Sequence, residues 1–292
     1  MILKPLKNAG IATAAYGVYG FLKLLGLDGA SWFAGKTSRL IGPRLGVNKV
    51  ARRNLKLAFP DITEQEMETT LKEMWENLGR VAGEMPHLKK LYRMPLGSRV
   101  EIEGLEHFEA LLKNGQNAIL ASGHFGNWEI ITNELPKLSN ADGMAVYRPL
   151  NNKIIDKLIL EARSVNNVRY LPKGPQGARE ILKGLKQGAF LGLLMDQKMN
   201  DGISVPFFGK NAMSPSAGAD LALKFNLPLL PVHVTRIKGA HFRLTFNAPI
   251  QLERKDGSRK TSADLMQEVH THFESWLKAT PSQWLWPHKR WP

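Results

Sequence analysis

A histidine and a glutamate five positions apart are the residues of this sequence best suited to acid–base chemistry. His124 stands between Gly123 and Gly126, and Glu129 follows. An imidazole can take a proton from a hydroxyl group at neutral pH, and a neighbouring carboxylate fixes its tautomer and stabilises the imidazolium. Five positions along one helix separate side chains by about 140°, so the pair meets only if the histidine lies in a loop and the glutamate in the next helical turn. The alternative is structural, a capping histidine and a glutamate at a helix amino end.

Two segments have the chemistry of anion binding. Arg148 lies between Tyr147 and Pro149 at the end of an apolar segment, where its guanidinium is placed to bind a phosphate or carboxylate through two hydrogen bonds. Ser214 before Pro215 fits the start of a helix whose free amides bind an anion. A plain helix cap is the alternative there.

A third polar segment follows the apolar run 190–195. Asp196 is a candidate second carboxylate near His124, and its alternative role is a loop salt bridge with Lys198. We therefore predict His124 and Glu129 as catalytic residues. The predicted substrate-binding residues are Arg148, Asp196, Lys198, Tyr147 and Asn127.

Metal and thiol chemistry find little support. The chain has no cysteine, which excludes a thiol nucleophile, a disulfide framework and cysteine-ligated zinc. No HExxH motif occurs, and His270 and His272 point apart if they share a helix. We expect no metal and no cofactor.

Short apolar segments alternate with helical patterns from residue 99 onward. Strict alternation is typical of an α/β fold with a mostly parallel central sheet and helices on both faces. Ligands bind such sheets at the carboxyl ends of strands, where His124, Arg148 and Asp196 are expected. The predicted strands are 100–102, 118–121, 144–147, 190–195, 229–234 and 242–246, and the predicted helices are 105–113, 127–138, 153–165, 176–186, 215–225 and 262–278.

The first 98 residues are predicted to be helical. The 15 residues between Lys7 and Lys23 are uncharged, whereas a helix that crosses a membrane needs about 20 apolar residues. We expect residues 1–27 to form a membrane-associated helix; a core helix and a targeting segment are the alternatives. Residues 28–98 continue as a helical region, and residues 99–292 form the α/β core with an aromatic tail.

Charge points to an anionic partner. The chain has 292 residues and a net charge of +14, with 40 Lys and Arg against 26 Asp and Glu. Basic residues from Arg39 to Lys56 follow the apolar segment, which is typical of an anchor on an anionic cytoplasmic membrane face, with a solvated helix surface as the alternative. Other anionic partners are nucleic acid, a phosphorylated substrate and an acidic carrier protein. No nucleic-acid-binding signature accompanies the scattered basic residues, so we expect no nucleic acid.

Tryptophan is concentrated at the carboxyl end. Four of the seven tryptophans lie in the last 17 residues, next to His288, Lys289 and Arg290. Interfacial tryptophans with cationic neighbours suit a membrane headgroup region. A tail that closes the hydrophobic core is the equal alternative.

Five blocks then occur in a characteristic order: GHFGNWE, YRP, MDQK, VPFFGK and PSQWLWPHKRW. Together they resemble the late acyltransferases of bacterial lipid A biosynthesis, and His124 with Glu129 is similar to the H-x4-D/E motif of glycerolipid acyltransferases. The resemblance runs from about residue 51 to the end of the chain, and the apolar amino-terminal helix is also similar. Glu129 stands where the wider superfamily has aspartate, but this branch commonly has glutamate.

The resemblance implies transfer of a fatty acyl chain from a thioester to a hydroxyl of a lipid A precursor. His124 would be the general base, Glu129 its partner, Arg148 a substrate-binding residue and Asp196 a further polar member of the site. Loop amides near Gly126 and the Arg148 guanidinium are the expected oxyanion donors. The implied partners are acyl carrier protein or acyl-CoA as donor, a phosphorylated glycolipid as acceptor and an anionic membrane, at the cytoplasmic face of the inner membrane. An acyltransferase for another glycolipid or a lysophospholipid, and a thioester hydrolase with the same residues, are the alternatives.

Overall fold

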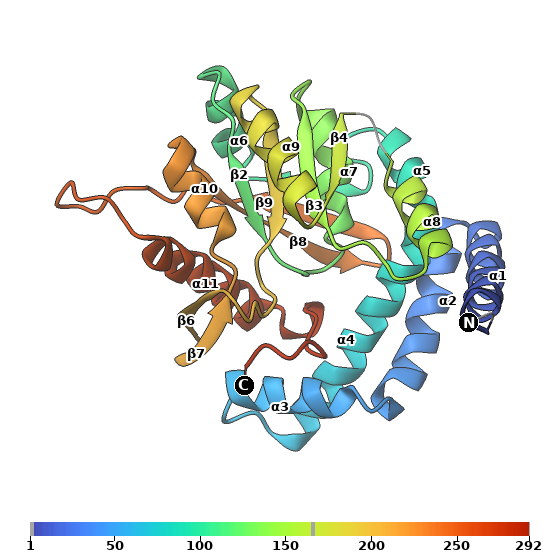
Figure 1. Cartoon of the computed structure of the whole chain (residues 1–292). Helices are drawn as coiled ribbons and strands as arrows, with labels where there is room; N and C mark the ends of the chain where they lie inside the picture. Colours follow the sequence, from blue (N-terminus) through green and yellow to red (C-terminus); the bar gives the residue numbers. More distant parts are fainter. Residues whose placement is uncertain (1–2, 165–166, 292) are drawn as a thin grey trace.

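A seven-stranded sheet in the order β1-β9-β8-β2-β5-β3-β4 forms the centre of the molecule (Figure 1). The computed structural model describes residues 3–164 and 167–291. Every neighbouring pair of strands is parallel except β8 and β9, which a turn through Gly239 joins as an antiparallel pair. The predicted mostly parallel sheet is confirmed. Its strands are β1 (Val100–Glu103), β2 (Ile119–Ser122), β3 (Gly143–Tyr147), β4 (Val168–Pro172), β5 (Phe190–Leu194), β8 (Leu229–Lys238) and β9 (His241–Phe246).

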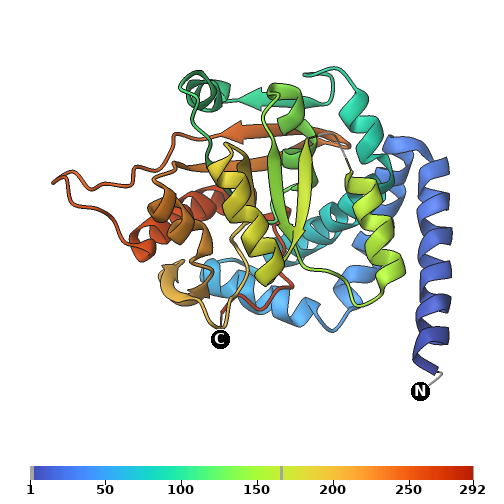
Figure 2. The ribbon, with the colours of Figure 1, turned by 45° about the horizontal axis from the view of Figure 1, so that its top comes forward.

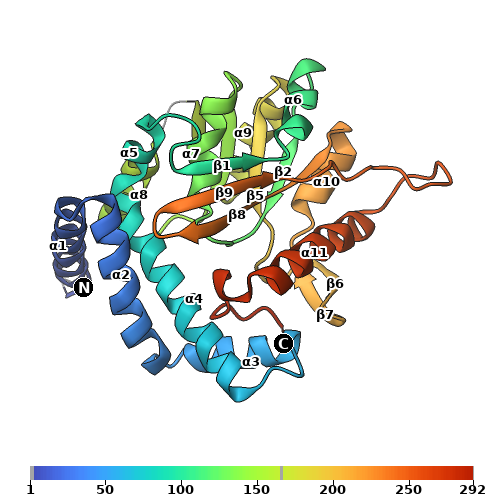
Figure 3. The same cartoon turned by 180° about the vertical axis from the view of Figure 1, so that it is seen from behind.

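Helices cover both faces of this sheet, as predicted. Successive residues of a strand point to opposite faces, and in β2 Ile119 and Ala121 join one hydrophobic cluster whereas Leu120 joins the other. Figure 3, the view from behind, shows helices on both sides of the strands. The first cluster contains residues of α3 (Asn48–Ala58), α4 (Glu64–Glu84), α9 (Pro175–Lys186), α10 (Ala217–Phe225) and α11 (Ser262–Ala279). The second contains residues of α2 (Gly26–Ile41), α5 (Leu88–Arg93), α6 (Leu105–Lys113) and α7 (Glu129–Leu138).

Three strands were missing from the prediction. β4 was not predicted because Arg169 and Tyr170 interrupt its apolar residues. The other two, β6 (Ile203–Phe207) and β7 (Lys210–Ser214), form an antiparallel hairpin outside the main sheet. Its two turn residues, Phe208 and Gly209, have φ angles of 50° and 68°, the backbone of a two-residue hairpin turn. Glycine adopts a positive φ angle without strain, but phenylalanine rarely does, so no residue pattern in the sequence indicated a hairpin turn at Phe208.

Several predicted boundaries move by a few residues. The helix predicted over 127–138 begins at Glu129, and the helix predicted from residue 215 begins at Ala217. The helix α8 (Lys153–Arg163) replaces the prediction 153–165, whose end at residue 165 lies outside the described residues. Ser214 is therefore the last residue of β7 and not a helix cap.

The amino-terminal region is helical, as predicted. α1 (Leu3–Leu24) packs against α2 and α8, and Figure 2 shows it at the periphery, away from the sheet. Within residues 3–164 and 167–291, no helix has both the length and the apolar character needed to cross a membrane. The proposed division into segments 1–27, 28–98 and 99–292 stays a prediction. Large apolar side chains are nevertheless exposed along α1, along α2 and at the residue between them: Ile11, Tyr16, Val18, Phe21, Leu24, Leu25, Trp32, Phe33, Leu40 and Ile41.

The carboxyl-terminal tail closes the core. Trp276, Trp284, Trp286 and Trp291 are between 0% and 6% exposed, so the membrane-interface interpretation of these tryptophans is wrong and the core interpretation is confirmed. The tail after α11 passes through η3 (Pro281–Gln283) and lies against α3, where the Asn54 amide donates hydrogen bonds to two of its carbonyl oxygens.

Candidate active site

Three parallel strands end side by side at the edge of the sheet where the polar residues lie. β2, β5 and β3 are neighbours, and their registers align Ser122 with Leu194 and Ala145 with Gly192. Because parallel strands that end in register deliver their next residues to one edge, the loops that carry His124, Asp196 and Arg148 leave the sheet together.

His124 and Asp196 form a polar pair at this edge. The imidazole Nδ1 of His124 lies 2.9 Å from Asp196 Oδ1, and its backbone N–H donates to Asp196 Oδ2 at 3.0 Å. The indole N–H of Trp284 donates to the same Oδ2 at 2.7 Å. The carboxylate therefore accepts bonds from both sides, and Asp196 lies where the sequence suggested a second carboxylate.

These contacts keep Asp196 ionised and set the tautomer of the histidine. Burial by itself raises the pKa of Asp196, but the charge and hydrogen bonds of His124, together with the bond from Trp284, outweigh burial and lower the pKa to about 2. An ionised carboxylate only accepts, so Nδ1 of His124 carries a proton, and in the neutral imidazole Nε2 therefore holds the lone pair. Within the described residues Nε2 has no hydrogen-bond partner, and the ring rests edge-on against Trp128. The imidazole is thus presented as a base.

Glu129 has a different partner from the one expected. Both of its carboxylate oxygens accept hydrogen bonds from the Arg163 guanidinium at the end of α8, and the indole of Trp128 donates to Oε1 at 3.0 Å. No hydrogen bond or ion pair joins Glu129 to His124 among the described residues. The predicted direct pairing of His124 with Glu129 is therefore wrong. The Glu129 carboxylate is 4% exposed and forms an ion pair with Arg163, which links α7 to α8.

Close backbone approach holds the histidine loop in place. Gly126 has φ +55°, and a Cβ there would lie 2.3 Å from the carbonyl oxygen of Val234 in β8. Its N–H donates to Gln283 O at 2.8 Å, and its carbonyl accepts from Asn77 of α4 at 2.9 Å. Only glycine meets both requirements, which explains the residue at this position.

A buried polar network supports the loop from α4. Arg236 donates to both carboxylate oxygens of Glu84 and, through Nε, to Asn77 at 2.8 Å. Asn127 donates to Glu84 at 2.7 Å and accepts from the Glu129 N–H at 3.2 Å. Its side chain has no exposed surface, so in this structure Asn127 positions the loop and does not face a substrate, contrary to the prediction.

Two cationic side chains at the edge lack protein partners. Arg148 is exposed and Lys198 is half-buried, and no hydrogen bond or ion pair of either side chain occurs within residues 3–164 and 167–291. The suggested salt bridge between Lys198 and Asp196 is absent from these residues. Tyr147, at the end of β3, is half-buried, and burial raises the pKa of its phenol. These residues remain available to a negatively charged substrate.

The expected oxyanion donors are partly occupied. The backbone N–H groups of His124, Phe125 and Gly126 all donate inside the protein, to Asp196, Gly123 and Gln283. Those loop amides cannot also bind a developing oxyanion. The guanidinium of Arg148 is the expected donor that keeps its N–H groups free.

The predicted anion site at Ser214 is wrong. Its hydroxyl is fully buried, near His270 Nε2 at 3.2 Å, and accepts from Arg290 at 2.6 Å. Burial and then the Arg290 charge lower the pKa of His270 to about 4. This Ser–His pair faces the core and has no surface through which a substrate could reach it.

Sequence reasoning missed Arg163 and the role of the tail. Arg163 lies 34 positions after Glu129, and no local pattern links the two. Trp284 and His288 stand in the quoted PSQWLWPHKRW block; Trp284 binds Asp196, and His288 Nε2 accepts from the Lys198 N–H at 2.8 Å. The block itself was the available signal. No group of three or more His, Cys, Asp or Glu side chains suited to a metal occurs in the described part of the chain.

The fold and the site define an α/β protein with a carboxylate-held histidine at the carboxyl edge of a mostly parallel sheet. The model of the family described as bacterial lipid A biosynthesis acyltransferase matches residues 6–292. The chain belongs to this family.

Individual relatives are distant. The chain is 24% identical over 246 residues to the lipid A biosynthesis lauroyltransferase of Escherichia coli, covering 83% of this chain and 78% of that protein. It is 26% identical over 248 residues to a lipid A biosynthesis acyltransferase of Haemophilus influenzae, covering 82% and 76%. A phosphatidylinositol mannoside acyltransferase of Mycobacterium tuberculosis is 27% identical over 218 residues, covering 72% and 68%.

Proposed function

We propose that this protein transfers a fatty acyl chain from a thioester to a hydroxyl group of a lipid A precursor, with His124 as the general base. The observation that carries the proposal is the contact between His124 Nδ1 and Asp196. In the neutral imidazole this contact puts the proton on Nδ1 and the lone pair on Nε2, which has no hydrogen-bond partner among the described residues. Membership of the family and the names of the relatives support the substrate class.

In the reaction, Nε2 of His124 takes the proton of the acceptor hydroxyl as its oxygen attacks the thioester carbonyl. The tetrahedral intermediate collapses to an ester, and the imidazolium returns the proton to the departing thiolate. Asp196 holds the ring and stabilises the imidazolium without itself taking a proton. Arg148 stabilises the oxyanion or binds the acceptor phosphate, and Lys198 adds a second positive charge.

The donor and the membrane are part of the same proposal. An acyl carrier protein is acidic and suits a chain with a net charge of +14, and acyl-CoA also carries phosphates. The exposed apolar side chains of α1 and α2 would lie on the cytoplasmic face of the inner membrane, where a phosphorylated glycolipid acceptor is reached. Acylation of another glycolipid is the second candidate, favoured by the match to a phosphatidylinositol mannoside acyltransferase.

The test is acyl transfer from acyl carrier protein to an under-acylated lipid A precursor, with the product identified by mass spectrometry. We expect the mass to rise by one acyl chain. His124→Ala should lower the rate by about 10²- to 10⁴-fold, because the base is lost, while its circular dichroism spectrum stays unchanged. His241→Ala, an exposed histidine at the start of β9, is the matched control.

Transfer by His124→Ala within about tenfold of the wild-type rate would reject the base role. Acylation of a phosphatidylinositol mannoside in place of the lipid A precursor would keep the chemistry and change the acceptor. Release of free fatty acid with no acylated product would favour the hydrolase alternative.

A further inference from the structure

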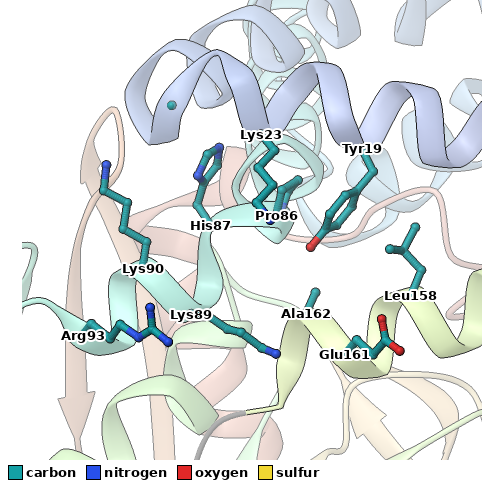
Figure 4. A pocket seen from close by; sticks show the side chains of 11 residues that line it. Tyr19, Lys23, Pro86, His87, Lys89, Lys90, Arg93, Leu158, Glu161 and Ala162 are labelled. Carbon is teal, nitrogen blue, oxygen red and sulfur yellow. The ribbon is translucent and has the colours of Figure 1, made fainter.

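A basic cavity of about 710 Å³ lies between α1, the segment η2 (Met85–His87) with α5, and α8 (Figure 4). None of the predicted or observed residues of the candidate active site lines it. The cationic side chains of the lining are Lys23, Lys89, Lys90 and Arg93, and its acidic side chain is Glu161.

None of these four side chains forms an ion pair or a side-chain hydrogen bond within the described residues. Glu161, the acidic side chain of the lining, lies 3.8 Å from Lys157. Like charges that converge on one cavity repel one another, and a bound anion relieves that repulsion. The charge pattern therefore fits an anion.

Neutral groups complete the lining. The phenol of Tyr19 points from α1 into the cavity (Figure 4), and burial followed by the nearby Glu161 raises its pKa, so the hydroxyl is protonated and can donate. His87 lies against Leu22 O at 3.1 Å, and burial lowers its pKa, with Lys90 and Lys23 lowering it further. His87 therefore donates to Leu22 O and adds no charge, and the four cations with the phenol of Tyr19 have the chemistry that binds a phosphate group.

The surroundings favour a phosphate that is attached to a lipid. Leu24, directly after Lys23, is 88% exposed, and Phe21 and Trp32 are 45% and 58% exposed on the same pair of helices. A surface that exposes several large apolar side chains marks a membrane or protein contact. A basic cavity beside it is in the position where a phospholipid headgroup would lie if the apolar side chains enter the acyl region.

We propose that this cavity binds the phosphate of an anionic phospholipid headgroup and so fixes the orientation of the protein on the membrane. The proposal rests on the membrane contact of α1 and α2 in the proposed function. It adds a lipid site separate from the acceptor site, because the cavity faces α1 and α8 whereas His124 lies at the carboxyl edge of the sheet.

The test compares two variants of the full chain that lose the same charge. Lys89→Gln/Lys90→Gln/Arg93→Gln removes three cations from the cavity; the control Lys183→Gln/Lys186→Gln/Lys255→Gln removes three exposed cations of α9 and of the loop before α11. Binding is measured by co-sedimentation with phosphatidylcholine vesicles that contain phosphatidylglycerol. We expect the cavity variant to lose at least about tenfold in affinity and the control less than about twofold.

The remaining outcomes separate the sources of the phosphate. Inorganic phosphate or glycerol phosphate at moderate concentration should not release the protein from these vesicles, and release by either would overturn the lipid assignment. Equal losses in the two variants would overturn the site and leave only general charge attraction. The charge-conserving variant Lys89→Arg/Lys90→Arg should bind as wild type does.

Failure of the proposed function is distinguishable from failure of this proposal. Acyl transfer measured in detergent micelles does not depend on phosphatidylglycerol, so the cavity variant should keep the wild-type rate there. Loss of vesicle binding with intact transfer in micelles supports the lipid site. Absence of transfer in every variant, including the wild type, rejects the enzyme assignment while the vesicle comparison still decides the site.

Discussion

Asp196 acts on His124 by its position and its constant charge. It accepts from the ring Nδ1, from the backbone N–H of the same histidine and from Trp284, so both oxygens are used. Because its pKa is about 2, it stays a carboxylate wherever a histidine base can work. In the proposed reaction, the proton is therefore taken up and returned by His124, and Asp196 stays ionised.

The lowered pKa of Asp196 predicts a pH-dependent contribution to stability. A carboxyl whose folded pKa lies below its ordinary value of 3.8 stabilises the fold above about pH 4, and this contribution is lost as the pH falls towards 2. We expect Asp196→Asn to unfold more easily than wild type at pH 6. The difference in free energy of unfolding should shrink by about 2 kcal/mol between pH 4.5 and 2.

Denaturant unfolding across this pH range measures the effect. The control is Asp201→Asn, an exposed aspartate in the same loop, whose difference from wild type should not change with pH. A constant difference for Asp196→Asn would mean that Asp196 is not held ionised by the contacts described.

At the scale of elements, the Glu129–Arg163 pair joins the helix that follows the histidine loop to α8. Glu129 is 4% exposed and Arg163 20%, so either charge left alone would be poorly solvated. We expect Glu129→Gln and Arg163→Gln each to lower the free energy of unfolding by about 3 kcal/mol and to reduce transfer, because the loop loses its support. Thermal unfolding and transfer rates of both variants measure this.

The double variant provides the decisive comparison. If Glu129 acts through Arg163, the double variant should be no worse than either single variant, because each already removes the pair. Additive losses of activity would instead show that Glu129 acts on the substrate or on His124 independently of Arg163.

Gly126 sets the course of the histidine loop. Gly126→Ala places a Cβ against Val234 O, whereas Gly115→Ala, at φ +61°, meets open space. Both substitutions carry the cost of a left-handed backbone, so the difference between them isolates the clash. We expect Gly126→Ala to lose about 1–3 kcal/mol more stability than Gly115→Ala and most of the transfer activity, as measured by unfolding and by rate. Equal effects of the two substitutions would show that the close approach of Gly126 to Val234 does not affect stability or transfer.

At the scale of the whole molecule, the exposed apolar surface lies apart from His124 and Asp196. The exposed apolar side chains concentrate on α1 and α2, which lie at the periphery (Figure 1), while the histidine and its carboxylate lie at the sheet edge. In the proposed function, α1 and α2 would rest on a membrane while the sheet edge receives the two substrates.

A charge placed in the apolar surface tests that arrangement. We expect Leu24→Glu/Trp32→Glu to lower binding to anionic vesicles at least about tenfold, because two carboxylates would have to enter the headgroup boundary. Gln187→Glu/Gln251→Glu adds the same charge at exposed positions elsewhere and should change binding far less. Co-sedimentation at fixed ionic strength measures both, and equal losses would argue against a membrane contact at α1 and α2.

Local sequence patterns were sufficient to predict the class of fold and the sheet edge at which the candidate active-site residues lie. Alternating apolar segments and helical patterns imply parallel strands, and parallel strands bring His124, Arg148 and Asp196 to one edge because their carboxyl ends meet there. The charge of the whole chain and the helical character of the amino-terminal region were also predicted from the sequence. These properties follow from local periodicity and composition, which need no knowledge of long-range packing.

The hydrogen-bond partners of the site residues became known only from the tertiary structure. His124 binds a carboxylate 72 positions away, Glu129 binds an arginine 34 positions away, and Trp284 reaches Asp196 from the end of the chain. Motif spacing led to the prediction that His124 pairs with the nearby Glu129. Two carboxylates were available, Glu129 and Asp196, and sequence spacing does not determine which of them faces the imidazole ring. The choice depends on strand order and on how the tail packs under the sheet edge, and both arise from contacts between residues far apart in the sequence.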